Sequence, residues 1–241
     1  MKPFLLIQSR EDIASDDEHK SFAKFCDLKP NQLVRCRIET GVVPDINLDD
    51  YSGIILGGGP WNASNPKKTP PQISAEKSLF KLLNEIVARD FPFLGACYGV
   101  GLLTNYLGGS VGKKYGEPVS GVSITLTAEG RNDPITADMT ETFTGIVGHK
   151  EAADSLPNGA VLLATSAACP VQMFRVRNNI YATQFHPELD SPALILRIKI
   201  YKNHGYFAPE ETDELIAMAE KIDATESTKI LKNFVKLATN R

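Results

Sequence analysis

The chain has 241 residues, of which 42% are hydrophobic and 23% are charged, with a formal net charge of −3. This length suffices for one large α/β domain, and the interleaved acidic and basic residues argue against nucleic acid or an anionic membrane as a main partner. Four scattered cysteines are typical of a reducing compartment. Because no C-x-x-C pair is present, we expect no metal site, and we also expect no cofactor.

The first predicted element is a short apolar run at residues 4–7. It predicts a buried strand, because it is too short for a signal peptide. No stretch approaches the length of a membrane span, and we therefore expect a soluble, cytoplasmic protein. Residues 15–18 read as a capping box, which predicts a helix beginning there with Phe22, Phe25 and Cys26 on its buried face.

Strands and helices alternate through the first half of the chain. Buried strands are predicted at residues 33–38, 54–56 and 91–94. Amphipathic or buried helices are predicted at residues 74–89 and 100–107. This alternation, with central strands that are apolar throughout, is typical of a parallel sheet covered by helices on both faces.

The remaining chain is first rich in strands and then helical. Strands are predicted at residues 119–127, 141–147, 161–165, 171–176 and 180–185, the last two forming a hairpin. Helices are predicted at residues 192–203, from Pro209 onward, and at 225–238. Because no linker separates these parts, we expect one domain over residues 1–200 and a helical C-terminal extension over residues 201–241, packed on or near that domain.

Cys97 stands in the strongest local motif, Gly95-Ala96-Cys97-Tyr98-Gly99, between a buried strand and a helix. Glycines flanking such a sharp turn avoid collisions with neighbouring backbone, and the helix N-terminus behind the sulfur favours the thiolate. A lone cysteine after a strand is more often a small buried residue. The two glycines and the flanking elements favour a nucleophile instead.

A nucleophilic thiol needs a base, and the base needs an orienting group. His186 follows a predicted strand and precedes Pro187 and Glu188. Proline restricts the backbone next to the imidazole, and the Glu188 carboxylate is placed to accept a hydrogen bond from one ring nitrogen. Taken alone, this segment is equally consistent with a strand end that has a surface carboxylate.

The glycine run Gly57-Gly58-Gly59-Pro60 follows the third predicted strand. Its N–H groups are unobstructed by side chains, and it is expected at the carboxyl edge of the sheet beside Cys97. Such N–H groups stabilise the oxyanion of acyl transfer. A plain glycine turn is the alternative.

These three motifs, in this order, resemble the class I glutamine amidotransferase domain over roughly residues 4–200. The resemblance implies a flavodoxin-like or Rossmann-like three-layer sandwich with a mostly parallel central sheet. It also implies a catalytic triad of Cys97, His186 and Glu188. The N–H groups of Gly59 and Tyr98 would form the oxyanion hole.

The resemblance extends to the substrate pocket, where it implies contacts from Gly58 and from the segment Gly148-His149-Lys150-Glu151. Cys169 lies in a stretch that resembles one found in stand-alone members of the family, and we interpret it as a structural residue. One position departs from the family pattern, because Gly101 replaces a glutamine that helps to bind the amino-acid end of the substrate.

We therefore expect hydrolysis of a glutamine-type side-chain amide through a γ-glutamyl thioester on Cys97. The ammonia would pass to a separate synthetase partner, or hydrolysis would be the whole reaction. Gly101 keeps two alternatives open. One is a γ-glutamyl peptide hydrolase with the same triad, and the other is a non-catalytic regulatory homologue.

Overall fold

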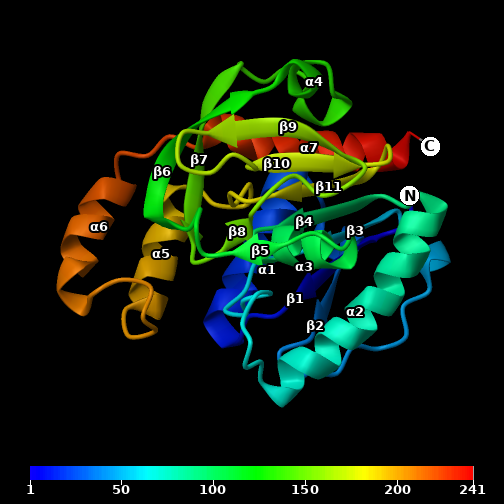
Figure 1. The fold of residues 1–241 in the computed structure, drawn as a ribbon, viewed down its shortest axis with the longest axis horizontal. Helices are drawn as coiled ribbons and strands as arrows, with labels where there is room; N and C mark the ends of the chain where they lie inside the picture. The colour runs from blue at the N-terminus through cyan, green and yellow to red at the C-terminus, as the bar shows by residue number, and fades with distance from the viewer. Residues whose placement is uncertain (241) are drawn as a thin grey trace.

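The computed structural model describes residues 1–240, which fold around one nine-stranded sheet with strand order β2-β1-β3-β4-β11-β10-β9-β6-β7 (Figure 1). The strands are β1 (Phe4–Gln8), β2 (Leu33–Arg37), β3 (Gly53–Leu56), β4 (Phe93–Ala96), β6 (Glu117–Leu126), β7 (Thr142–His149), β9 (Ala160–Ser166), β10 (Met173–Val176) and β11 (Ile180–Thr183). A separate two-stranded sheet pairs β5 (Val111–Gly112) with β8 (Ala152–Ala153). The α-helices are α1 (Asp12–Cys26), α2 (Pro70–Arg89), α3 (Tyr98–Tyr106), α4 (Ala128–Arg131), α5 (Ser191–Tyr201), α6 (Thr212–Ala219) and α7 (Thr225–Thr239).

The sheet has a parallel half and an antiparallel half. Strands β2, β1, β3, β4 and β11 pair in parallel, and β10, β9, β6 and β7 continue the sheet in antiparallel pairs. The predicted hairpin of the last two strands is confirmed as β10 and β11. Because β11 lies parallel to β4, with Thr183 opposite Ala96, segments far apart in sequence leave the sheet at the same edge.

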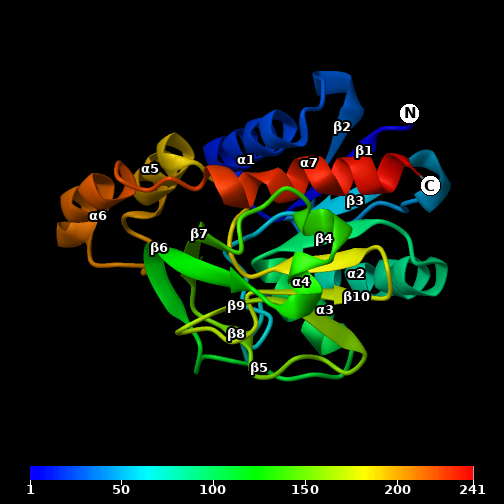
Figure 2. The ribbon, with the colours of Figure 1, turned by 90° about the horizontal axis from the view of Figure 1, so that it is seen from above.

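Helices cover both faces of the parallel half, as Figure 2 shows from above. Alternate residues of β1 point to opposite sides. Leu5 and Ile7 join the core under α2 and α3, whereas Phe4 and Leu6 join the core under α1 and α7. These buried faces form the three layers, and the expected α/β fold class is confirmed.

The predicted start of the first helix is wrong. Helix α1 begins at Asp12, and the N–H of Ser15 already donates to the carbonyl of Glu11. The hydroxyl of Ser15 accepts from Arg35 instead of capping the helix, and Glu18 is fully buried against Arg10. Partners outside the helix thus occupy both side chains that a capping box requires.

The C-terminal residues complete the helical layers. Helix α7 packs beside α1 and places Phe234 against Phe4 of β1, with ring centroids 6.1 Å apart. Helices α5 and α6 pack against each other and share a smaller core with Ile146 of β7. The division at residue 200 stays a prediction. No helix among the described residues is long and apolar enough to cross a membrane.

Candidate functional site

Cys97 occupies a strained turn between β4 and α3. Its φ of 50° is positive, which is rare for a residue other than glycine and is found where a nucleophile is held on a sharp strand-to-helix turn. Its N–H donates to the carbonyl of Thr183 on β11 at 2.7 Å. The turn is therefore anchored to the neighbouring strand, and the side chain stays partly accessible.

Only one of the two flanking glycines is required by its surroundings. A Cβ on Gly95 would lie 2.9 Å from the Cα of Gly99, which real side chains do not tolerate. A Cβ on Gly99 would meet only Leu56, at an ordinary 3.9 Å. The expectation that both glycines prevent collisions is thus wrong at Gly99, because α3 leaves open space on that side.

His186 and Glu188 form a buried pair directly after β11. The Nδ1 atom of His186 lies 2.8 Å from Oε1 of Glu188. Burial lowers the pKa of His186, but the Glu188 carboxylate and the Cys97 sulfur outweigh it and raise the pKa to about 9. Burial raises the pKa of Glu188, and the imidazolium reverses this and lowers it to about 2. Near neutral pH the two groups are therefore an ion pair.

The structure brings Cys97 and His186 to one cavity, although they are 89 positions apart in sequence. The pairing of β4 with β11 explains this, because both residues follow the carboxyl ends of adjacent parallel strands. Gly58 makes room for the imidazole. A Cβ on Gly58 would lie 2.7 Å from Cε1 of His186, so any larger residue would displace the ring.

Both residues predicted for the oxyanion hole lie next to Cys97. Gly59 and Tyr98 line one cavity with it. Tyr98 is the first residue of α3, so no residue of that helix accepts its N–H. Its side chain points into the core, where the hydroxyl donates to Glu76 at 2.9 Å.

Two cavities meet at Cys97. The first, which we call the polar cavity, is lined by four of the predicted substrate-binding residues together with other side chains: Trp61, Asn62, Gly101, His149, Lys150, Glu151 and Gln184. The second, which we call the apolar cavity, contains His186 and is walled by Val119, Ile146, Leu194, Ile198 and Phe207. Gly58, also predicted to contact substrate, lines neither cavity and lies beside His186 instead.

Glu151 supports a loop of the polar cavity. Its carboxylate accepts from the N–H of Ala63 at 2.5 Å, and from the N–H and hydroxyl of Ser64 at 2.8 and 2.6 Å. The same loop fills the space beside Gly101, where a Cβ would lie 2.8 Å from the Cβ of Ala63 and 3.2 Å from Glu151. Gly101 therefore allows the loop to pack closely on α3.

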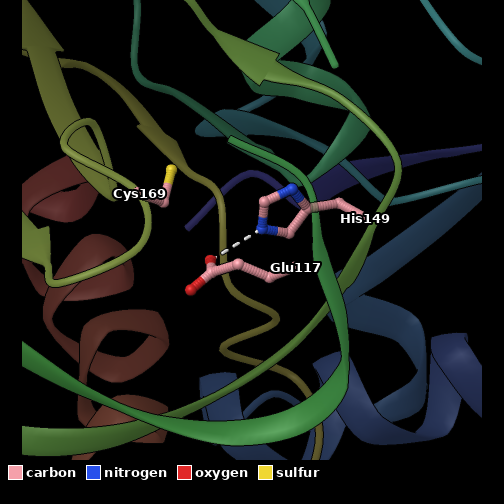
Figure 3. A group of neighbouring side chains, drawn as sticks. All are labelled: Glu117, His149 and Cys169. Carbon is pink, nitrogen blue, oxygen red and sulfur yellow. Dashed lines mark hydrogen bonds and ion pairs between the residues drawn. The ribbon is translucent and has the colours of Figure 1, made fainter. Parts of the chain in front are cut away.

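Glu117, His149 and Cys169 form a buried cluster (Figure 3), and His149 also lines the polar cavity. Their ligand atoms lie within 4.8 Å of one another, so these three residue types could hold a metal ion. In the structure the His149 ring is already engaged by other groups of the protein. Nε2 of His149 contacts Glu117 at 2.9 Å, and Nδ1 contacts the carbonyl of Glu151 at 2.9 Å. Burial raises the pKa of Cys169 to about 12.

Sequence reasoning missed this cluster because its members come from β6, β7 and the segment before β10, with no short spacing to connect them. It also missed two buried cations at the apolar cavity, Arg10 and Arg197. Neither has a periodic signature, and a basic residue read from sequence is ordinarily assigned to the surface.

Comparison with known proteins places the chain among glutamine amidotransferases. A family model described as glutamine amidotransferase class-I matches residues 24–194. A glutamine-hydrolyzing GMP synthase of Streptococcus thermophilus (strain CNRZ 1066) is 29% identical over 178 residues, covering 70% of this chain and 29% of that protein. The protein of the same name from Borrelia garinii subsp. bavariensis is 31% identical over 170 residues, covering 66% of this chain and 30% of that protein. The chain thus spans less than a third of the length of these relatives.

Solved structures share the fold over nearly the whole chain. A glutamine amidotransferase from Thermotoga maritima superposes with a TM-score of 0.79 at 22% identity, covering 100% of this chain and 99% of that one. A glutamine amido transferase from Methylobacillus flagellatus gives a TM-score of 0.72 at 19% identity, covering 98% and 95%. Since the family model matches well over half of the residues, and these structures share the architecture, this chain belongs to the class I glutamine amidotransferase family.

Proposed function

We propose that this protein hydrolyses a glutamine-type side-chain amide, with Cys97 as nucleophile, His186 as acid and base, and Glu188 as the orienting carboxylate. The observation that carries the proposal is the His186–Glu188 ion pair, which opens onto the cavity where Cys97 stands on its strained turn. An imidazolium beside a thiol favours the thiolate, which is the reactive form.

The reaction begins when the Cys97 thiolate attacks the amide carbon and a C–S bond forms. The carbonyl oxygen becomes an oxyanion, which the N–H groups of Gly59 and Tyr98 stabilise. Because Nδ1 of His186 faces Glu188, Nε2 is the nitrogen that donates a proton to the departing nitrogen as the C–N bond breaks. A γ-glutamyl thioester and the free amine or ammonia result.

Water then attacks the thioester carbon, and Nε2 of His186 accepts its proton. The C–S bond breaks, releasing the carboxylic acid and restoring the thiolate–imidazolium pair. The polar cavity, with Lys150 and Gln184 on its wall, holds the amino-acid end of the substrate. With glutamine as substrate the released ammonia is free for a synthetase partner, as the name of the GMP synthase relatives suggests.

The test is release of ammonia and glutamate from L-glutamine and from γ-glutamyl compounds, with Cys97→Ala protein as the blank. We expect turnover to be lost in this variant while the circular dichroism spectrum is unchanged. A glutamine-analogue electrophile should label Cys97 with one equivalent. A thiol that stays unreactive with every compound would contradict the proposal and favour a regulatory protein without catalysis.

A γ-glutamyl peptide hydrolase is the second candidate, and the packing at Gly101 favours considering it. The glutamine expected there in the family is absent, and the Ala63 loop occupies its place. Recognition of free glutamine therefore lacks one of its usual contacts, whereas the proposed triad of Cys97, His186 and Glu188 does not involve position 101. Comparison of kcat/KM for glutamine and for γ-glutamyl peptides separates the two candidates.

A further inference from the structure

One side chain of the C-terminal extension reaches the point where the two cavities meet. Residues 202–207, which we call the lid segment, follow α5 and place Tyr206 on the wall of both cavities. Three other residues border both cavities, namely Gly59, Cys97 and Gly148, and all three are small. Tyr206 is therefore the large side chain at this junction. It lies beyond residues 24–194, the part of the chain that the family model matches.

The contacts of Tyr206 place its side chain over the site. Nζ of Lys150 lies 4.4 Å from the centroid of the Tyr206 ring, which is the geometry of a cation–π contact. The ring of Tyr201 lies 5.4 Å away on α5. Burial raises the pKa of Tyr206 to about 12, and the charges of Arg10 and Cys97 also act on it. The phenol thus lies close to the nucleophile and to the lysine of the polar cavity.

The polar cavity is too small for the glutamyl end of a substrate. It leaves about 20 Å³ of free space beside Cys97. One water molecule needs roughly 10–15 Å³ on this scale, so the space holds about one or two water molecules. The glutamyl end consists of a carboxylate, an amino group and a chain of carbon atoms, which need a larger volume. A wall of this cavity must therefore move before the substrate binds.

Other walls of the polar cavity are fixed by hydrogen bonds. The carboxylate of Glu151 accepts from the N–H and hydroxyl of Ser64 at 2.8 and 2.6 Å. His149 contacts Glu117 at 2.9 Å through Nε2. These bonds join β6, β7 and the loop before α2, so moving either wall would break polar contacts.

The lid segment lacks such bonds. Within the described part of the chain, residues 205–207 make no backbone hydrogen bond, and residues 202–205 are exposed. Gly205 has a φ of 70°, in the left-handed region that favours glycine. Phe207 packs against the small core of α5 and α6, which anchors the end of the segment. A stretch with exposed backbone and few hydrogen bonds opens at a low cost in free energy.

We propose that the lid segment opens to admit the substrate, and that Tyr206 then closes over the glutamyl group as a specificity-determining residue. This inference rests on the proposed function and adds to it a substrate contact from the C-terminal extension. The aromatic ring covers the carbon chain of the glutamyl group and removes apolar surface from water. Because His186 and Glu188 stay in place without the ring, loss of Tyr206 weakens substrate binding more than it slows the chemical steps.

Steady-state kinetics of the full chain test the substrate contact. The substrate is L-glutamine, or the γ-glutamyl amide that the parent protein hydrolyses fastest. Tyr206→Ala removes the ring, and we expect KM to rise about tenfold or more while kcat falls less than about threefold. Tyr206→Phe returns the ring and should bring KM back to within about threefold of the parent value. Asn203→Ala is the matched control, since Asn203 is exposed on the same segment and lines neither cavity.

Alkylation of Cys97 by iodoacetamide tests the cover without any turnover. Rates are compared on the high-pH plateau, where the thiol is ionised in every variant and its pKa no longer affects the rate. We expect Cys97 in Tyr206→Ala to react about fivefold faster or more than in the parent, because the closed lid shields the sulfur. Tyr206→Phe and Asn203→Ala should react at the parent rate.

The outcomes separate the lid from the proposed function. Equal alkylation rates in the parent and Tyr206→Ala proteins, or a rise in KM that Tyr206→Phe does not reverse, would overturn the role of the ring and leave the proposed function standing. The same changes in Asn203→Ala as in Tyr206→Ala would also overturn it. Absence of turnover with every amide would refute the proposed function, and the alkylation rates would then still decide whether Tyr206 covers Cys97.

Discussion

Replacing Glu188 with glutamine isolates the charge of the orienting carboxylate. Glutamine has nearly the same shape as glutamate and keeps one oxygen that can face Nδ1 of His186. In the parent protein this Nδ1 lies 2.8 Å from Oε1 of Glu188. The carboxylate is the largest influence raising the pKa of His186 against the effect of burial. Without it, the pKa should fall from about 9 towards its ordinary value of 6.5.

The size of this change sets the expected loss of activity. A fall in the pKa of His186 from about 9 to 6.5 corresponds to about 3 kcal/mol of lost stabilisation of the imidazolium. If the transition state for attack depends on the thiolate–imidazolium pair, kcat/KM should fall by about 10²- to 10³-fold near neutral pH. Loss of Cys97 should be more severe, because no nucleophile remains.

Two measurements check this reasoning. The His186 ring is titrated by NMR in both proteins, and kcat/KM is measured from pH 5 to 10. Glu85→Gln is the control, since Glu85 is an exposed carboxylate of α2 remote from the site. A pKa of His186 that stays near 9 in the Glu188→Gln protein, or a loss of activity below tenfold, would refute the electrostatic role.

The same pair makes stability depend on pH. Because the folded pKa of His186 is raised, its contribution is complete below about 6.5 and is lost as the pH rises through about 9. Because the folded pKa of Glu188 is lowered, its contribution is complete above about 4.5 and is lost as the pH falls through about 2. The ion pair therefore stabilises the fold most between about pH 4.5 and 6.5.

Three further outcomes are expected. Urea unfolding should show the largest free-energy difference between the parent and Glu188→Gln proteins near pH 5.5 and a smaller one at pH 9.5; a difference that grows with pH would contradict the pairing. Iodoacetamide at pH 7.5 should label Cys97 alone in the folded protein by mass spectrometry, because the other three thiols are buried; early labelling of Cys169 would be inconsistent with its burial. Gly101→Ala should destabilise the protein by about 1–3 kcal/mol through crowding against Ala63, whereas Gly99→Ala has space and should be neutral or stabilising.

Much of the fold follows from local patterns in the sequence. The apolar runs that became β1, β3 and β4 are buried on both faces, which is why they contain no alternating polar positions. The turn at Cys97 could be read from its glycines and from the elements around it. The place of β11 beside β4 could not be read in this way, because strand order depends on contacts between distant segments.

The error at the first helix comes from side-chain contacts made outside the helix. Ser15 and Glu18 have the spacing of a helix cap, but Arg35 of β2 binds Ser15, and Arg10, just before the helix, binds Glu18. A local rule applies to a side chain only when no distant group competes for it. Arg10 itself could not be recognised from sequence, since its buried contacts with Glu18 and Tyr201 exist only in the assembled fold.

The role of Gly101, where the chain departs from the family pattern, can be understood only from the folded structure. In sequence, Gly101 is a missing contact to the substrate. In the structure it is a close approach between α3 and the Ala63 loop, which Glu151 fixes through the N–H groups of Ala63 and Ser64. A glutamine at this position would have to displace that loop, so restoring the family residue should not restore the family contact. We infer that binding of the glutamyl end depends on the polar groups that remain on the cavity wall, such as Lys150.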